Sequence, residues 1–213
     1  MKLLYLFCCL LFTTLLYGQQ PDTLIITPIY TSLYSQTYNM PKEVSYKLYQ
    51  AGGPCSREAE NMTFHLDHIK LHISSKDYAN SGYDIGHMAP AADFAYNCYL
   101  EELTFRFYNS VPQSPKSNRG NWKSYETKIR NLSQNDSLLV LCGPIIDQHT
   151  KKFKKTRLYV PTHTWKVVYS LSTNQLIYCK IFDNDNVTAK VNDITLIELE
   201  KLTNLDLSLI KNR

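Results

Sequence analysis

Tyr83–Pro90, with the sequence YDIGHMAP, places a carboxylate, a glycine and a histidine within four residues, a density of chemical groups that no other stretch of the chain matches. Asp84 accepts hydrogen bonds or carries charge, and Gly86 gives the backbone a freedom that other residues lack. His87 is the side chain whose unperturbed pKa lies nearest neutrality. The stretch predicts a compact acid–base element, with a loop that carries a surface histidine as the simpler alternative.

The first residues follow the order of a secretory signal peptide. Met1 and Lys2 precede an uncharged apolar run, Leu3–Tyr17, which ends at the small residue Gly18. A run of about 15 apolar residues is shorter than the ~20 that span a bilayer, and this order is typical of a cleaved signal. We expect a signal peptide at residues 1–18 and a secreted or periplasmic chain without a membrane anchor. A retained anchor is the alternative.

The remaining residues, 19–213, suit a single domain, because domains commonly reach about 200 residues. Among the 213 residues, 44% are hydrophobic and 16 are tyrosines, which favours a sheet-rich protein with half-buried tyrosines on its strands. The formal net charge of +4 is mild. The basic residues nevertheless cluster, as a polyanionic partner would require: Lys116, Arg119, Lys123, Lys128 and Arg130, then Lys151, Lys152, Lys154, Lys155 and Arg157.

Four cysteines follow the expected signal, whereas Cys8 and Cys9 lie inside it. An even number in an exported chain favours disulfides, and no C-x-x-C spacing suggests a metal or redox pair. Four cysteines allow three connectivities. We favour Cys142 with Cys179, because both lie in strand-like runs, and therefore Cys55 with Cys98.

Strand patterns dominate both ends of the chain. Thr23–Thr31 is rich in Ile and Thr and predicts an extended segment or arm, and Glu43–Tyr49 alternates apolar and polar residues as a half-buried strand does. The last third holds β-rich runs with short turns, which implies antiparallel pairing; these runs are 138–142, 157–161, 165–170 and 175–182.

Two helices are predicted between and after these strands. From Gly120, apolar residues recur at three and four residues, the stripe of an amphipathic helix: Trp122, Tyr125, Ile129 and Leu132. A last helix is expected within 191–207, whereas Pro112 and Pro115 forbid a continuous helix before Gly120. The fold class is therefore α+β in one domain.

The two functional stretches suggest a small metal site beside a base. Asn118 follows the Asp84-x-Gly86-His87 stretch by about 30 residues, and Glu126 follows Asn118 by eight on the predicted helix. Mg²⁺ takes oxygen ligands and keeps several waters, so one amide oxygen plus waters held by a carboxylate would suit it. Taken singly, Asn118 is a turn residue and Glu126 part of a solvated helix face.

At this point the sequence resembles the DNA/RNA non-specific endonucleases, the family of mitochondrial endonuclease G and the secreted sugar-nonspecific nucleases. The likeness covers about residues 44–207, and its ordered motifs are Asp77-Tyr78, Ser81-Gly82-Tyr83-Asp84-x-Gly86-His87-x-Ala89-Pro90, Asn109-x-x-Pro112-Gln113, Asn118-x-Gly120-x-Trp122-x-x-x-Glu126-x-x-x-Arg130, Gly143-Pro144 and Val160-Pro161-Thr162 before Trp165-Lys166-Val167-Val168. The resemblance implies a ββα-metal (His-Me finger) core on a central antiparallel sheet flanked by helices.

The resemblance also implies roles for individual residues. His87 falls at the general base that takes a proton from the attacking water, Asn118 at the Mg²⁺ ligand, and Glu126 at the residue that holds metal-bound water. Asn109 falls at the residue that helps orient the histidine, and Arg130 at a supporting arginine. Mn²⁺ is the expected substitute for Mg²⁺.

One position departs from the family pattern. The family usually has Asp-Arg-Gly-His, and here Ile85 replaces the arginine, while Asp84 keeps a structural role. Phosphodiester cleavage develops negative charge that a positioned cation or metal stabilises. The candidates to supply that cation are Arg57, as a catalytic arginine upstream of the motif, and Arg106, Lys116 and Arg119, as residues that bind the substrate.

The resemblance favours a secreted, Mg²⁺-dependent endonuclease that cuts DNA and RNA with little sequence preference. Phosphate contacts give affinity without sequence information, and no base-reading module is recognisable. The alternative is a catalytically weak relative that binds nucleic acid or a protein partner, supported by Ile85. A disulfide-stapled module without catalysis is a third possibility, which the ordered motifs disfavour. Monomer and homodimer are both open.

Overall fold

The protein is described here from a computed structural model, which covers residues 21–58, 60, 62–65, 71–153 and 156–208. The expected signal peptide, with Cys8 and Cys9, lies outside the described residues, as do Lys154 and Lys155. Within the described part of the chain, no helix is long and apolar enough to cross a membrane.

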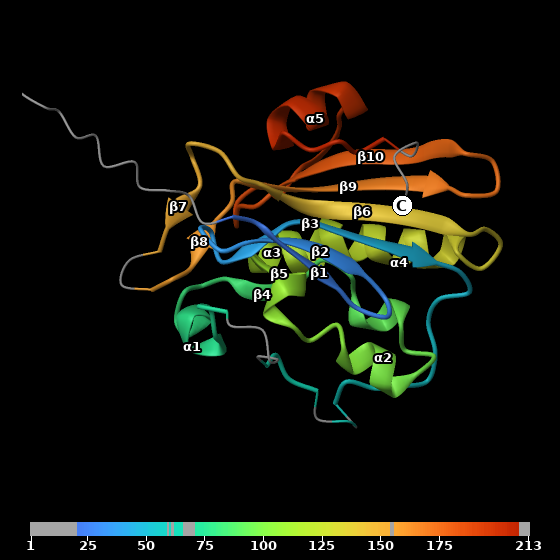
Figure 1. The fold of residues 1–213 in the computed structure, drawn as a ribbon, viewed down its shortest axis with the longest axis horizontal. Helices are drawn as coiled ribbons and strands as arrows, with labels where there is room; N and C mark the ends of the chain where they lie inside the picture. Colours follow the sequence, from blue (N-terminus) through green and yellow to red (C-terminus); the bar gives the residue numbers. More distant parts are fainter. Residues whose placement is uncertain (1–20, 59, 61, 66–70, 154–155, 209–213) are drawn as a thin grey trace, which may run out of the picture.

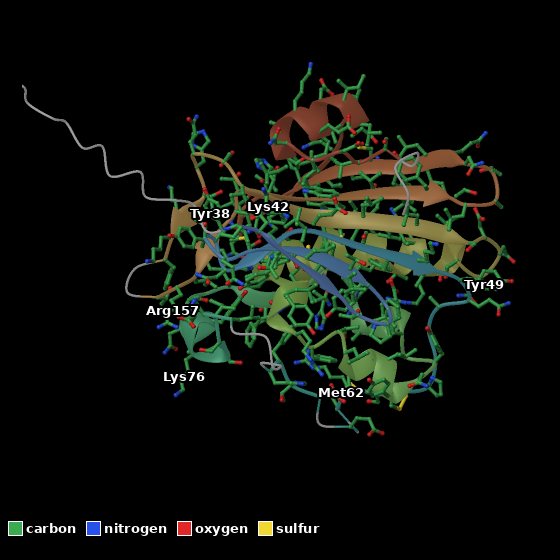
Figure 2. All side chains as sticks on the ribbon, in the orientation of Figure 1. Tyr38, Lys42, Tyr49, Met62, Lys76 and Arg157 are labelled. Atoms are coloured by element: carbon green, nitrogen blue, oxygen red, sulfur yellow. A yellow bond between two sulfur atoms is a disulfide. The ribbon has the colours of Figure 1, made fainter. Side chains whose placement is uncertain are left out.

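A seven-stranded antiparallel sheet forms the centre of the molecule and confirms the predicted fold class (Figure 1). The residues expected to form an extended segment or an arm are extended and build the first edge of this sheet. Tyr38 and Tyr49, which flank β3, lie at opposite ends of the sheet (Figure 2). In spatial order the strands are β1 (Thr23–Ile26), β2 (Thr31–Ser35), β3 (Met40–Leu48), β6 (Leu138–Ile145), β9 (His163–Ser170), β10 (Gln175–Asp183) and β11 (Val191–Asp193).

The sheet buries both of its faces, so successive residues of its central strands enter different cores. Leu139 and Leu141 of β6 pack with Leu199 of α5 (Leu196–Thr203), which covers one face (Figure 1). Val140 and Cys142 belong to the core on the other face. That second core also holds apolar residues of the layer that carries the candidate site.

The layer on this second face is the ββα unit that the resemblance implied. β4 (Asp84–His87) pairs antiparallel with β5 (Ser110–Gln113), and α3 (Pro115–Ser117), a π-helical turn (Asn118–Trp122) and α4 (Lys123–Leu132) follow. The remaining elements are α1 (Ser75–Tyr78), the 3₁₀ turns Ala91–Asp93 and Phe107–Asn109, α2 (Cys98–Glu102), and the short pair β7 (Lys151–Lys152) and β8 (Tyr159–Val160).

Local signals set the boundaries of these helices more narrowly than periodicity predicted. The helix expected from Gly120 begins as α4 at Lys123, because the backbone of Gly120 leaves helical geometry (φ −100°, ψ −110°). The last helix begins only at Leu196, where Thr195 and Glu198 form a capping box. The residues before it form β11.

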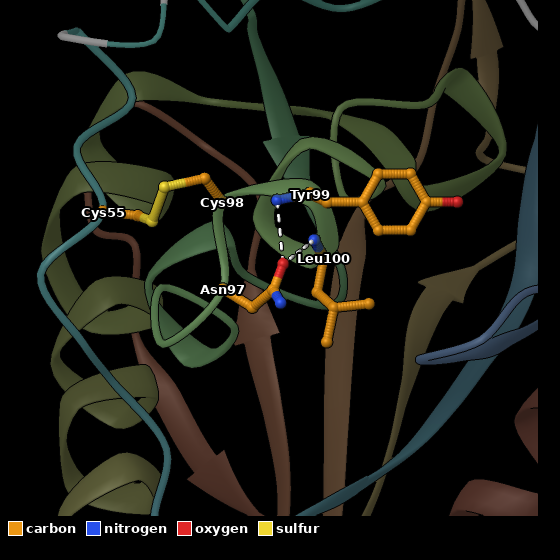
Figure 3. Close-up of a disulfide and its surroundings, with 5 residues drawn as sticks. All are labelled: Cys55, Asn97, Cys98, Tyr99 and Leu100. Carbon is orange, nitrogen blue, oxygen red and sulfur yellow. Dashed lines mark hydrogen bonds between the residues drawn. A yellow bond between two sulfur atoms is a disulfide. The ribbon is translucent and has the colours of Figure 1, made fainter.

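One of the two expected disulfides is present. Cys55 and Cys98 are bonded, with Cα atoms 5.4 Å apart, and tie the segment after β3 to α2 (Figure 3). In the same helix, the side chain of Asn97 accepts hydrogen bonds from the backbone N–H groups of Tyr99 and Leu100 (Figure 3). The bridge thus fastens a capped helix to the segment that leads to Arg57.

The expected bond between Cys142 and Cys179 is wrong, and the sheet register explains why. Cys142 on β6 pairs with Lys166 of β9, whereas Cys179 on β10 pairs with Val167 of the same strand. Strand β9 therefore separates the two cysteines. Because Lys166 and Val167 are adjacent on that strand, the cysteines also face opposite sides of the sheet. Both are buried free thiols.

Candidate active site

A cleft of about 240 Å³ beside α4 brings together six of the predicted site residues. Larger hollows of about 680 Å³ lie near β1–β3 and near β8–β9, but neither contains the histidine or the residues of α4. The predicted residues that line the cleft are Arg57, His87, Asn118, Arg119, Glu126 and Arg130.

His87 ends strand β4 with its ring held between two aromatic side chains. The ring centroids of Phe64 and Phe105 lie 4.7 Å and 4.8 Å from that of His87. Its Nε2 atom is buried and has no hydrogen-bond partner among the described residues. Burial, reinforced by the nearby charge of Arg57, lowers the pKa of His87 to about 3. The imidazole is therefore neutral around pH 7 and able to accept a proton.

The lowered pKa of His87 predicts a pH-dependent contribution to stability. The folded state holds this ring neutral down to about pH 3, whereas the unfolded state protonates it below about 6.5. Between these values the unfolded state binds more protons, so stability falls as the pH falls, by up to about 1.4 kcal/mol per pH unit. We expect urea titrations between pH 4 and 7 to give a shallower pH dependence for His87→Ala. Equal slopes would contradict a buried neutral His87.

Gly86 is required by close approach and not by its backbone angles. It does not have the positive φ that favours glycine. A Cβ atom built on Gly86 would instead collide with the side chain of Gln113, which lies against it from the paired strand. We predicted that this position needs glycine for its backbone conformation. The structure shows that it needs glycine because the side chain of Gln113 leaves no room for a Cβ atom.

Asp84 does not line the cleft itself but binds two residues that do. Its carboxylate accepts a hydrogen bond from Nδ2 of Asn118 at 2.9 Å and from Nε of Arg119 at 2.9 Å, and its other oxygen accepts from Nη2 of Arg119 at 2.6 Å. Burial opposes its ionisation, but these bonds outweigh burial and hold the pKa of Asp84 below its usual value. With its amide nitrogen engaged, Asn118 offers its oxygen, Oδ1, as a ligand.

Asn109 fixes the backbone that follows His87. Its side chain is fully buried, and Oδ1 accepts from the N–H of Ala89 while Nδ2 donates to the carbonyl oxygen of Ala89, both at 2.8 Å. Nδ2 also donates to the carbonyl oxygen of Thr104 at 2.9 Å. This residue does not line the cleft, so its geometry fits the predicted orienting role.

Three charged residues lie on the α4 side of the cleft, and one of them is fully buried. Nε of Arg130 donates to Oδ1 of Asp93 at 2.8 Å, and Asp93 is completely buried. Burial raises the pKa of Asp93 to about 6 and that of Glu126 to about 7. Sequence reasoning did not identify Asp93, although a carboxylate in an apolar, alanine-rich run was an available signal.

The four candidate cations fall into two groups: two line the cleft, and two lie outside it. Arg57 lies over the ring of Phe105, 5.1 Å from its centroid, and lines the cleft with Arg119. Arg106 is buried, with its guanidinium on Glu102, and the ammonium of Lys116 donates to the carbonyl oxygen of Val187. Neither Arg106 nor Lys116 lines the cleft, so geometry disfavours their expected substrate contacts.

Comparison with known proteins agrees with this arrangement. The family model described as DNA/RNA non-specific endonuclease matches residues 13–209. The chain belongs to this family. It is 31% identical to a nuclease of Nostoc sp. over 150 residues, which cover 64% of this chain and 54% of that protein. It is 30% identical to human mitochondrial endonuclease G over 112 residues, which cover 47% and 38%. The matches thus span about half or less of these relatives.

The fold is also similar to that of a solved structure. A chain in the crystal structure of the EndoG/EndoGI complex superimposes on this chain with a TM-score of 0.72. The match covers 88% of this chain and 86% of that chain at 21% identity. At this identity the likeness establishes the fold.

Ile85 stands at the position where the resemblance led us to expect an arginine. That side chain packs against an apolar cluster that includes Phe107 and Leu158, with Phe64 at its margin. Phe64 is also the residue against which His87 lies. An apolar residue thus stands where a motif cation was expected, while Arg57 lines the cleft and its charge acts on His87.

The cleft offers oxygen donors to a hard cation. Asn118 and Glu126 both line it, and Oδ1 of Asn118 accepts no hydrogen bond from the described residues. In the described part of the chain, no group of three or more His, Cys, Asp or Glu side chains is arranged to hold a metal. Such a sparse donor set suits Mg²⁺, which keeps waters and binds substrate phosphates, better than a fully protein-ligated ion.

Proposed function

We propose that this protein is a secreted or periplasmic, Mg²⁺-dependent endonuclease that hydrolyses phosphodiester bonds of DNA and RNA with little sequence specificity. The observation that carries the proposal is the single cleft in which a neutral His87 faces the amide and carboxylate groups of Asn118 and Glu126, with Arg57 and Arg119 beside them. These groups are suited to bind a phosphate and to activate the water that attacks it. The sequence has no recognisable module that reads bases.

In the mechanism, His87 takes a proton from the water that attacks phosphorus. Asp84 holds Asn118 and Arg119 in place. The amide oxygen of Asn118 and the guanidinium of Arg119 would then act on the same phosphate. A bound Mg²⁺, or Mn²⁺ in its place, would be held by Asn118 and by waters on Glu126, and would stabilise charge on the phosphate and the leaving 3′-oxygen. The products would carry 5′-phosphates.

The electrostatics of the cleft also change when substrate binds. In the free protein a pKa of about 3 makes His87 a weak base, since the best catalytic pKa lies near the operating pH. A phosphodiester places negative charge beside the ring and offsets Arg57, and both effects raise the pKa of His87. Substrate binding would thus strengthen the base at the site of reaction.

Plasmid nicking tests the proposed function. The mature chain, residues 19–213 as a single domain, should convert supercoiled plasmid to open circles and then fragments with Mg²⁺ or Mn²⁺, and should degrade RNA, whereas EDTA should abolish both activities. Sedimentation of the same sample distinguishes monomer from homodimer. Binding of nucleic acid without cleavage would support the alternative, a catalytically weak relative, which Ile85 favours.

The replacement at Ile85 gives a paired prediction. If Arg57 makes the phosphate contact expected of the motif arginine, Arg57→Ala should lower kcat about 10²-fold, as the loss of a positioned hydrogen-bond donor to the transition state does. Ile85→Arg should then gain little, because the new guanidinium would enter an apolar cluster beside an existing cation. Initial rates of plasmid nicking measure both effects. Arg106→Ala is the control, because it removes another arginine that lies outside the cleft. A large gain in Ile85→Arg with a silent Arg57→Ala would show that no cation compensates.

A further inference from the structure

The disulfide between Cys55 and Cys98 joins two segments that each lead into the cleft, and the mechanism above gives it no role (Figure 3). The two cysteines are 43 residues apart in the sequence. Arg57 follows Cys55 by two residues and lines the cleft. Cys98 begins α2, and Phe105, which also lines the cleft, comes shortly after that helix. The bridge therefore connects the backbone that carries a cation of the cleft to the backbone that carries one of its walls.

Phe105 is the side chain on which the cation and the base meet. Its ring is fully buried, so its position is fixed by the core around it. The guanidinium carbon of Arg57 lies 5.1 Å from the centroid of this ring, within the range of a cation–π contact. The ring of His87 packs edge-on against the same ring, with centroids 4.8 Å apart. Arg57 thus serves the cleft only while its backbone stays within reach of Phe105.

The segment that carries Arg57 is attached at its two ends. The described residues between Cys55 and His65 belong to no helix or strand. The N–H of Cys55 donates to the carbonyl oxygen of Ala95 at 3.0 Å, and the N–H of His65 donates to that of Phe105 at 3.2 Å. Arg57 itself is exposed, and a cation–π contact at an exposed site is weak. The attachment at Cys55 therefore decides where Arg57 lies.

The disulfide is the strong part of that attachment. It fixes Cys55 to the first residue of α2, a helix whose start is capped by Asn97. Two residues of chain span at most about 7 Å, so an intact bridge confines Arg57 to the neighbourhood of one fixed point. Without the bridge, the single hydrogen bond to Ala95 would hold this end, and Arg57 would spend less time in the cleft. Catalysis depends on such preorganisation, because a displaced group loses most of its effect on the transition state.

We propose that the Cys55–Cys98 disulfide is a positioning element of the active site, which holds Arg57 in the cleft. The inference rests on the proposed function. A dithiol reductant would transfer two electrons and two protons to the sulfur atoms of the bridge. The S–S bond breaks, two thiols form, and the dithiol closes to a cyclic disulfide. The reduced protein keeps its fold and loses the contribution of Arg57 to the reaction, so the cleft is fully active only in the oxidised protein.

Dithiothreitol, applied to wild type and to Arg57→Ala, tests the proposal. Reduction should lower kcat of the wild type about 10²-fold, to the level of Arg57→Ala, and reoxidation should restore it. In Arg57→Ala there is no guanidinium to release, so reduction should cost less than about twofold. Alkylation and mass spectrometry confirm that the two bridge thiols have formed. Equal losses in both proteins, full kcat in the reduced wild type, or a silent Arg57→Ala would overturn the proposal.

Asn97→Ala is the matched control, because it loosens the start of α2 and leaves the bridge intact. Its side chain accepts hydrogen bonds from two backbone N–H groups of that helix, so its loss should lower the melting temperature while kcat stays unchanged. The double variant Cys55→Ser/Cys98→Ser should match the reduced wild type and be insensitive to dithiothreitol. Circular dichroism follows the fold throughout. Unfolding of both the reduced wild type and the double variant would assign the bridge to fold stability alone and overturn the proposal.

Tryptic cleavage after Arg57 tests the same geometry without the activity. Proteolysis of a folded protein follows the population of the opened segment. We expect cleavage after Arg57 to become about tenfold or more faster on reduction, whereas cleavage at Lys201 on α5 should be unchanged. An unchanged rate after Arg57 would overturn the proposal. An inactive, folded and oxidised wild-type protein would refute the proposed function instead, and the digestion would still decide whether the bridge holds Arg57.

Discussion

His87→Ala is expected to lower kcat about 10²- to 10⁴-fold, the range for loss of a general base. The imidazole is the only neutral base that the described residues place in the cleft, and Asn109 and Trp122 hold the backbone around it. KM for DNA should change little, because arginines supply the binding charge. Single-turnover cleavage of a labelled duplex measures the effect.

His163→Ala is the matched control for this prediction. His163 begins β9 and pairs with Asp183 at 3.4 Å, outside the cleft, so its loss should leave kcat unchanged. Circular dichroism of both variants should match the wild type. A folded His87→Ala variant with near-full activity would show that another group accepts the proton.

Asn118→Ala should lower the cleavage rate by a similar factor when Mg²⁺ is limiting. The metal ion would supply several kcal/mol of transition-state stabilisation, so losing its protein ligand should lower the rate about 10³-fold at limiting Mg²⁺. Added Mg²⁺ should restore part of the rate, which distinguishes a weakened metal site from a lost base. Initial rates over a Mg²⁺ titration measure both effects.

Asn121→Ala controls for the turn that carries Asn118. Its side chain donates to the carbonyl oxygen of Ala189 at 2.7 Å and does not line the cleft. The Mg²⁺ dependence of Asn121→Ala should therefore match that of wild type. If Asn118→Ala and wild type also showed the same Mg²⁺ dependence, the ligand assignment would be wrong.

Features encoded locally were the ones that the sequence predicted. Alternation identified β3, and the spacing of Trp122 and Ile129 identified α4. The ββα unit was implied by the family resemblance that the motif around His87 helps to carry. Each depends on residues close together in the chain, so its pattern survives without knowledge of the tertiary fold. The same patterns placed His87, Asn118 and Glu126 in one cleft.

Features that depend on strand order and burial were missed or wrong. The expected pair Cys142–Cys179 failed because β9 lies between the strands, a fact of sheet order that no local pattern contains. Asp93 and Lys166 gave only weak signals, because a charged residue is normally read as exposed. Asp93 ends a 3₁₀ turn and Lys166 lies on strand β9, and each is buried only because other elements of the fold pack over it.

The burial of His87 also changes the expected pH dependence. With an unperturbed histidine as the base, activity would fall below a pH of about 6.5 as the base became protonated. With its pKa lowered to about 3, the free protein keeps this base neutral throughout the acid range. In the free protein, the group that becomes protonated near neutral pH is therefore Glu126, whose pKa is raised to about 7, and not His87.

Cleavage in water enriched in ¹⁸O tests most directly whether this cleft hydrolyses phosphodiesters by water attack. A short DNA duplex is digested in the presence of Mg²⁺, in a single turnover, and the fragments are weighed by mass spectrometry. Our account predicts 5′-phosphate products that carry one ¹⁸O atom, at a rate that collapses in His87→Ala. Products with 3′-phosphates, unlabelled 5′-phosphates, or no cleavage by the folded wild-type protein would contradict it.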